Sequence, residues 1–80
     1  MSIKEDIKHI EYEEKFVYGE LVIYGDEGDF NNEYELTEKC ARDDLEEFFW
    51  DTQNHTIDEI DEMMKNIVIK KVWIEKRREL

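Results

Sequence analysis

Apolar residues near the N-terminus recur at helical spacing. Ile3, Ile7 and Ile10 follow one another at i, i+4 and i+7, and Ser2-Ile-Lys-Glu5 has the spacing of a capping box. The pattern predicts a short amphipathic helix at the N-terminus. The alternative is that Ile10 and Tyr12, which one polar residue separates, open a strand.

The next apolar stretch has the composition of a strand. Residues 16–24 are mostly β-branched or aromatic, and only Gly19-Glu20 interrupts them, where a bulge or a bend is expected. Residues 25–29 supply turn-forming Gly and Asp, and apolar positions then alternate with polar ones over 30–36. The pattern predicts a hairpin of these two strands, the second of which has room to run on to Cys40.

Two helices are predicted in the second half of the chain. Asp43-Asp-Leu-Glu46 has an acidic cap with Glu three positions later, and Thr56-Ile-Asp-Glu59 repeats this start signal. The first helix is expected to end near Gln53-Asn54. The predicted apolar faces consist of Leu45, Phe48, Phe49 and Thr52 on the first helix and of Ile57, Ile60, Met64 and Ile67 on the second.

A last strand follows at 67–74, where the run is apolar enough on both faces to predict a position inside the sheet rather than at its margin. The predicted order of elements is α-β-β-α-α-β. The fold class is therefore α+β, with helices packed on one face of a small antiparallel sheet. The 80 residues contain no proline and no linker-like segment, which predicts a single compact domain over 1–80.

The charge is concentrated in one block of the chain. The sequence has 23 acidic and 11 basic residues, a net charge of −12. Residues 11–62 hold nineteen of the acids and three bases, whereas residues 63–80 hold six bases and two acids. The electric field of so many negative charges governs which partners approach the protein and how fast they do so. Solubility alone needs a far smaller net charge. The excess therefore points to association with a basic partner.

We expect the acids to form a partner-binding surface that includes a tryptophan. At 100° per residue Trp50 lies about 140° from Leu45, on the side of its helix that carries several acids. Glutamates two apart share one face of the predicted hairpin and would extend this surface as a ridge. The alternative is that a loop partly covers Trp50. The candidate partner-binding residues are Glu33, Glu35, Asp43, Glu46, Glu47, Trp50, Asp58 and Glu62.

The sequence contains no recognisable catalytic or ligand-binding motif. His9, Cys40 and His55 are too scattered for a zinc site, and the acids of 26–33 lack the spacing of a calcium loop. As the single cysteine, Cys40 is expected to pack as a small apolar residue in a reducing compartment. We expect no enzymatic activity, no cofactor and no metal. The lack of a signal peptide and of a long apolar run predicts a cytoplasmic location.

In size, acidity and lack of catalytic motifs the whole chain resembles the phage-encoded inhibitors of host defence, the anti-CRISPR and anti-restriction proteins, several of which mimic nucleic acid. The resemblance includes no diagnostic motif, so no residue roles carry over. It implies a non-enzymatic inhibitor in the host cytoplasm. The implied partner is the basic groove of a nucleic-acid-binding protein, such as a Cas effector or a nuclease, with no direct contact to nucleic acid or membrane.

Two other functions stay open on the sequence. An immunity protein that neutralises a nuclease toxin would share the same electrostatics, and an adaptor module would bind through the aromatic residues around Trp50 and Trp73. The basic residues of 70–78 are expected to pair with glutamates of the hairpin or to guard a sheet edge. A homodimer, in which this segment meets the acidic face of a second chain, is a further arrangement.

Overall fold

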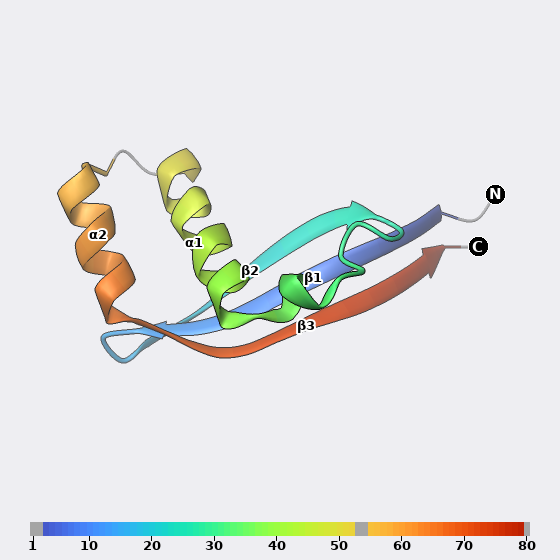
Figure 1. Cartoon of the computed structure of the whole chain (residues 1–80), viewed down its shortest axis with the longest axis horizontal. Coiled ribbons are helices and arrows are strands. Elements are labelled where there is room, and N and C mark those ends of the chain that lie inside the picture. The colour runs from blue at the N-terminus through green and yellow to red at the C-terminus, as the bar shows by residue number, and fades with distance from the viewer. Residues whose placement is uncertain (1–2, 53–54, 80) are drawn as a thin grey trace.

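Three antiparallel strands form a sheet, and two helices lie over one of its faces (Figure 1). The computed structural model describes residues 3–52 and 55–79. The elements are β1 (Ile3–Glu14), β2 (Val17–Asp26), the 3-10 helix η1 (Glu33–Leu36), α1 (Glu38–Thr52), α2 (Ile57–Asn66) and β3 (Ile67–Glu79). The strand order is β2-β1-β3. The molecule measures 46 × 23 × 21 Å, because the strands run well beyond the helices that cover them.

The order of the elements is β-β-α-α-β, so the predicted order α-β-β-α-α-β is wrong at its first element, the N-terminal helix, and at its third, the strand at 30–36. The chain forms β1 where a helix was expected, while Ser2 of the predicted capping box lies outside the described residues. Ile7 and Ile10 are both buried and lie on opposite faces of β1. This strand pairs with β2 along one edge and with β3 along the other. Pairing on both edges satisfies its backbone groups and outweighs a weak local preference for helix.

The hairpin consists of β1 and β2, not of the two segments predicted from the sequence. Lys15 and Phe16 form its two-residue turn, and both have positive φ angles, of 47° and 69°. Positive φ at both central residues gives the backbone twist that joins two antiparallel strands tightly. The predicted second strand at 30–36 is wrong because this segment contains η1. The side chain of Asn32 caps η1 by accepting a hydrogen bond from the Glu35 N–H.

The predicted bulge at Gly19-Glu20 is also wrong. The register of β2 against β1 continues unbroken through Gly19, which pairs with Tyr12. A Cβ atom on Gly19 would lie 2.5 Å from Cζ of Tyr12, so glycine leaves room for the tyrosine ring. The irregularity of the sheet lies in β3, where Glu11 pairs with Lys71 and Tyr12 with Ile69. The extra residue in β3 forms a bulge.

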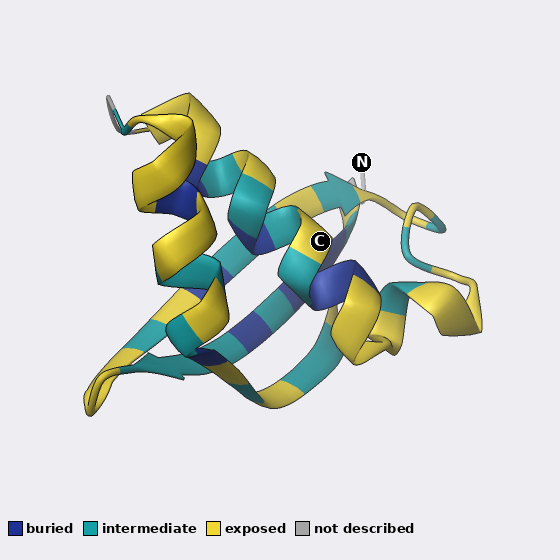
Figure 2. Cartoon of the chain, turned by 60° about the vertical axis from the view of Figure 1, so that its left-hand side comes forward, coloured by how far each residue is buried: buried dark blue, intermediate teal, exposed yellow. Residues whose placement is uncertain are grey.

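The core lies between the helices and the sheet, and the outward faces of both helices are exposed (Figure 2). The helix starts follow from side-chain caps. Thr56 accepts a hydrogen bond from the Glu59 N–H, as predicted, and α1 begins earlier than predicted because Thr37 accepts one from the Cys40 N–H. Gln53-Asn54, the predicted end of α1, lies outside the described residues. The buried core residues are Ile10, Leu21, Ala41, Leu45, Phe49, Ile60 and Ile67.

The last strand confirms the prediction of a strand at 67–74 and extends it to the C-terminal side. Its predicted position inside the sheet is wrong, since β1 occupies the middle and β3 forms an edge. Arg42 of α1 ties the start of β3 to the end of α2. Its guanidinium donates hydrogen bonds to the carbonyl oxygens of Ile67, at 2.8 Å, and of Met64. The Met64 carbonyl also accepts from the Ile67 N–H, so Arg42 adds a second hydrogen bond there at the end of α2.

Candidate protein-binding surface

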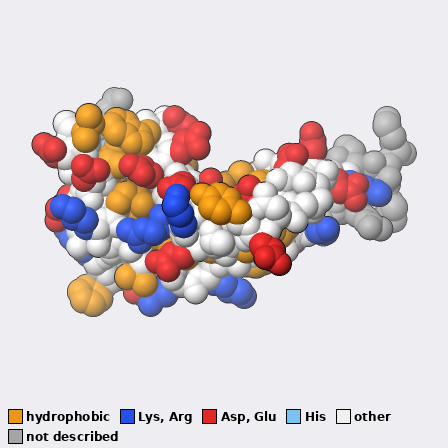
Figure 3. All heavy atoms as spheres, in the orientation of Figure 1, with side chains coloured by type: hydrophobic (Ala, Val, Ile, Leu, Met, Phe, Trp, Pro, Cys, Tyr) orange, Lys and Arg blue, Asp and Glu red, His pale blue; other side chains and the backbone are white. Residues whose placement is uncertain are grey.

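The two helices carry a large excess of negative charge on one side of the molecule. Together α1 and α2 contain ten acidic and three basic residues. Three of these acids contact a basic side chain, that of Lys8, Lys39 or His55. The other seven form no ion pair with any side chain in the described part of the chain. Figure 3 shows acidic side chains over the helices, with basic side chains over the lower parts of the helices and along the sheet.

Four of the candidate residues form one stripe along α1. Asp43, Glu46, Glu47 and Trp50 recur at i, i+3, i+4 and i+7, opposite the buried side that Leu45 belongs to. Trp50 is 46 % exposed, so about half of its surface is accessible to a partner. An exposed Trp within a row of carboxylates combines an apolar contact with a charged rim.

A groove of about 530 Å³ separates the exposed parts of α1 and α2. Glu46 lines it from α1, and Asp61 lines it from α2, so acids from both helices meet there. Arg42 also lies in the lining, but its guanidinium is occupied by the two carbonyl oxygens. Asp58 and Glu62 lie one turn apart on α2 and are both exposed. The helices therefore present a shared acidic surface.

Glu33 and Glu35 belong to η1 rather than to a strand, so the predicted ridge of hairpin glutamates is not formed. Glu33 is exposed, whereas Glu35 points into the molecule and forms an ion pair with Lys8. The charge of Glu35 is thereby neutralised. Of the eight candidate residues, Glu35 pairs with the buried Lys8, and Asp43 pairs with the exposed Lys39 at 3.6 Å.

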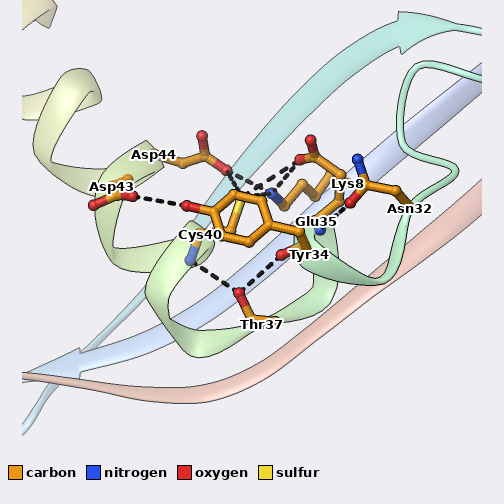
Figure 4. A network of polar contacts seen from close by, with 8 residues as sticks. All are labelled: Lys8, Asn32, Tyr34, Glu35, Thr37, Cys40, Asp43 and Asp44. Carbon is orange, nitrogen blue, oxygen red and sulfur yellow. Dashed lines mark hydrogen bonds and ion pairs between the residues drawn. The ribbon is translucent and has the colours of Figure 1, made fainter.

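A buried lysine organises the polar side chains between β1 and α1 (Figure 4). Lys8 is 0 % exposed, and its Nζ donates to Asp44 Oδ2 at 2.6 Å, to Glu35 Oε2 at 3.1 Å and to Cys40 Sγ at 3.1 Å. Burial lowers the pKa of Lys8, but the hydrogen bonds to Asp44, Cys40 and Glu35 outweigh burial, so that the pKa is raised above its ordinary value. Lys8 therefore stays charged at neutral pH.

The same side chains resemble a metal-ligand set in composition. Glu35, Cys40 and Asp44 place an oxygen, a sulfur and an oxygen within 4.8 Å of one another. The ammonium group of Lys8 bonds to all three and supplies the positive charge that a metal ion would bring. Burial also raises the pKa of Cys40, which keeps the sulfur as a thiol rather than a metal-binding thiolate. We assign the cluster to anchoring Lys8.

The basic residues of β3 lie apart from the acidic helices. Lys70 contacts Glu13 of β1 at 3.5 Å, so a base of this segment pairs with a glutamate, but with one of β1 rather than one of the predicted hairpin at 16–36. Trp73 stacks on His9 with 4.6 Å between the ring centroids, and Lys71 lies over the Trp73 ring. His9 lies on the face of the sheet opposite Lys8 and the helices. Trp73 therefore does not join Trp50 in one aromatic surface.

The sequence analysis did not single out Lys8 or Asp61. A signal for Lys8 is present once 3–14 is taken as a strand, because Lys8 then shares a face with Ile10, and a charged side chain on a buried face needs partners. No comparable signal exists for Asp61, since its place on the groove depends on how the helices pack.

Within the described residues, no helix has both the length and the apolar character needed to cross a membrane. The structural evidence on function consists of the acidic helix surface and the sites beside it. Comparisons of the chain with protein-family models, with curated proteins and with solved structures find no match.

Proposed function

We propose that this protein is a non-enzymatic inhibitor that binds a nucleic-acid-binding protein and blocks its basic groove. The acidic helix surface takes the place of the phosphate backbone. One observation carries the proposal: seven acids of α1 and α2 have no ion-pair partner among the described side chains, although the chain contains a basic strand. Charges left unpaired in the free protein are available to a partner.

The chemistry of such a partner follows from how proteins bind nucleic acids. Lys and Arg side chains that neutralise phosphates attract any surface with a dense row of negative charges. The stripe of α1 and the exposed acids of α2 supply this charge, and Trp50 supplies an apolar contact at its edge. Electrostatic steering makes association fast, and added salt weakens it. A Cas effector or a nuclease has a groove of this kind.

The experiment uses the full chain as bait for proteins of its source cell at low and at high salt. The captured protein is identified, and its binding to nucleic acid is followed by mobility shift while the chain is added. We expect the captured protein to bind nucleic acid and to release it as the chain is added. Capture is expected to fall steeply at high salt.

Two variants with equal charge change locate the surface. The first variant changes the acidic surface of the helices and carries Glu46→Lys, Asp58→Lys and Glu62→Lys. The second variant changes the ends of β1 and β2 and the turn after β2, and carries Glu14→Lys, Asp26→Lys and Glu27→Lys. We expect the first variant to lose displacement and the second to keep it. If both behave like the native chain while circular dichroism shows an intact fold, the proposal is wrong.

Trp50 separates the inhibitor from an adaptor module. Because its side chain is exposed, Trp50→Ala removes an apolar contact without opening the core. An adaptor that binds through aromatic residues would lose binding in Trp50→Ala and tolerate the triple charge reversal. The inhibitor shows the opposite ranking. An immunity protein would follow the inhibitor's ranking but would capture a single cognate nuclease toxin.

A further inference from the structure

The two edges of the sheet differ in how they are protected against pairing with another strand. β3 carries Lys70, Lys71, Lys76 and Arg77 and contains the bulge. Charged residues, lysine above all, and bulges are the features that keep natural edge strands from pairing. β2 has the sequence VYGELVIYGD, without lysine, arginine or proline, and its pairing with β1 is regular. By this comparison the edge of β2 is open to a further strand.

A groove runs along the open edge between β2 and α1. Its volume is about 550 Å³, and its apolar lining includes Leu21 and Ile23 of β2 and Phe48 of α1. In an antiparallel ladder, alternate residues of an edge strand turn their N–H and C=O groups away from the neighbouring strand. A polypeptide segment that enters this groove in extended form can hydrogen-bond to these N–H and C=O groups of β2 on one side. On its other side it contacts the apolar side chains that line the groove beneath α1.

The wall formed by α1 is acidic. Asp44, Glu47 and Asp51 line the groove at i, i+3 and i+7 of the helix. Asp44 is bound to Lys8, but Glu47 and Asp51 are exposed and form no ion pair with the side chains that the structure describes. A lysine or arginine of the entering chain can lay its aliphatic stem over Phe48 and bring its charged end to these carboxylates.

We propose that the β2 edge and the α1 wall together bind an extended segment of a partner protein in which apolar residues alternate with lysine or arginine. The segment adds a fourth strand to the sheet beside β2. Backbone hydrogen bonds supply affinity, while the apolar floor and the acidic wall select the alternating side chains. This strand-addition site shares Glu47 with the stripe of α1 that the proposed inhibitor function uses, whereas the β2 edge and the apolar floor of the groove belong to the strand-addition site alone.

A second copy of this chain is a weaker candidate for the same groove, although its β3 is basic. The lysines and the bulge of β3 disfavour pairing by that strand, and two chains of net charge −12 repel one another. Pairing of β2 with β3 of the next copy would also be head-to-tail. Such contacts build rings or open chains of molecules rather than a defined pair.

The test measures binding of a synthetic peptide of alternating valine and lysine to the full chain by fluorescence anisotropy. The double variant Glu47→Lys and Asp51→Lys reverses two charges on the wall of the groove. Its matched control, Asp58→Lys and Glu62→Lys, reverses two exposed acids at the same spacing on α2. We expect the groove variant to weaken binding about tenfold more than the control variant. If both variants weaken peptide binding equally, the peptide responds only to the total charge of the protein, and the proposed site is wrong.

Amide hydrogen exchange provides a second measurement that does not depend on charge. Addition of a strand is expected to slow exchange at alternate residues of β2, while the amides of β3 stay unchanged. Unchanged exchange in β2 with the peptide bound overturns strand addition. If β2 amides of the free chain become protected as its concentration rises, a second copy occupies the edge and the proposed partner is wrong. The pull-down and mobility shift above test the inhibitor function independently of these results.

Discussion

Lys8 Nζ lies 2.6 Å from Asp44 Oδ2, in a contact that joins the middle strand of the sheet to α1. Lys8 is fully buried, while the side chains of Asp44 and Glu35 are each 25 % exposed. The lysine thus brings its charge into the interior and meets two carboxylates near the surface. Asp44 of α1 and Glu35 of η1 therefore bind to the sheet through Lys8.

We expect Lys8→Met to lower the free energy of unfolding by about 3 kcal/mol, because it leaves two carboxylates close together without a cation. Urea unfolding measures the change. Lys65→Met, at an exposed position of α2, is the control and is expected to stay within about 0.5 kcal/mol of the native chain. Adding Glu35→Gln and Asp44→Asn to Lys8→Met should restore part of the loss. A loss no larger than that of the control would contradict the anchoring role of Lys8.

The turn between β1 and β2 places two ordinary L-residues at positive φ. Replacement by the Lys15→Asn and Phe16→Gly pair should raise the free energy of unfolding by about 1–2 kcal/mol, since Asn-Gly adopts this turn readily. Phe16 is fully exposed, so no buried surface is lost. Thermal unfolding measures the gain. Phe16→Ala removes the ring but keeps a Cβ atom, and a similar gain in this control would rule out relief of backbone strain.

His9 makes the stability of the sheet depend on pH. The hydrogen bond to Glu20, together with that to Glu75, raises the pKa of His9 above its ordinary value of 6.5. A group whose pKa is higher in the folded state stabilises that state fully below its unfolded pKa. The stabilisation is then lost as the pH rises through the folded pKa. The native chain should therefore lose stability relative to His9→Gln as the pH rises from about 6.5 into the alkaline range.

Urea midpoints of the two proteins across this range measure the pH effect. Glu75→Gln removes one of the two carboxylate partners of His9 and should give a smaller pH dependence than the native chain. If the native chain and His9→Gln follow parallel curves, the two carboxylates do not favour the charged form of His9.

Arg42 is expected to matter through hydrogen bonds rather than through charge. Arg42→Met keeps the aliphatic stem but removes the hydrogen bonds from the guanidinium to the carbonyl oxygens of Met64 and Ile67, and we expect the free energy of unfolding to fall by about 1–2 kcal/mol. Arg42→Lys should recover part of this loss, because a lysine lacks the fork that reaches two carbonyls. Faster amide exchange at the C-terminal end of α2 should accompany the loss. Lys39→Met, an exposed change of equal charge on α1, serves as the control and should leave that exchange unaltered.

Local signals predicted the elements that depend mainly on neighbouring residues. The β-branched and aromatic run at 16–24 lies in β2 from Val17 onward, and the Thr56 cap starts α2 as expected. The spacing along α1 placed Trp50 and Glu47 on its outer side, since helical geometry alone fixes which residues share a stripe. An Asn32 cap was overlooked, and the alternation at 30–36 therefore appeared to be a strand.

The sequence by itself determined in which block of the chain the acids are concentrated and that Leu45 and Phe49 face the core, because both are properties of residues close together in the chain. Ile57, which the pattern assigned to the apolar face of α2, is 64 % exposed. Only the tertiary structure decided that residues 3–14 form the central strand, since their backbone partners lie at 17–26 and 67–79. It also decided the role of Lys8 and Glu35, which are 27 positions apart. A buried charge is stable only where the fold brings opposite charges into contact with it. Contacts between residues so far apart in the sequence cannot be predicted from a local pattern.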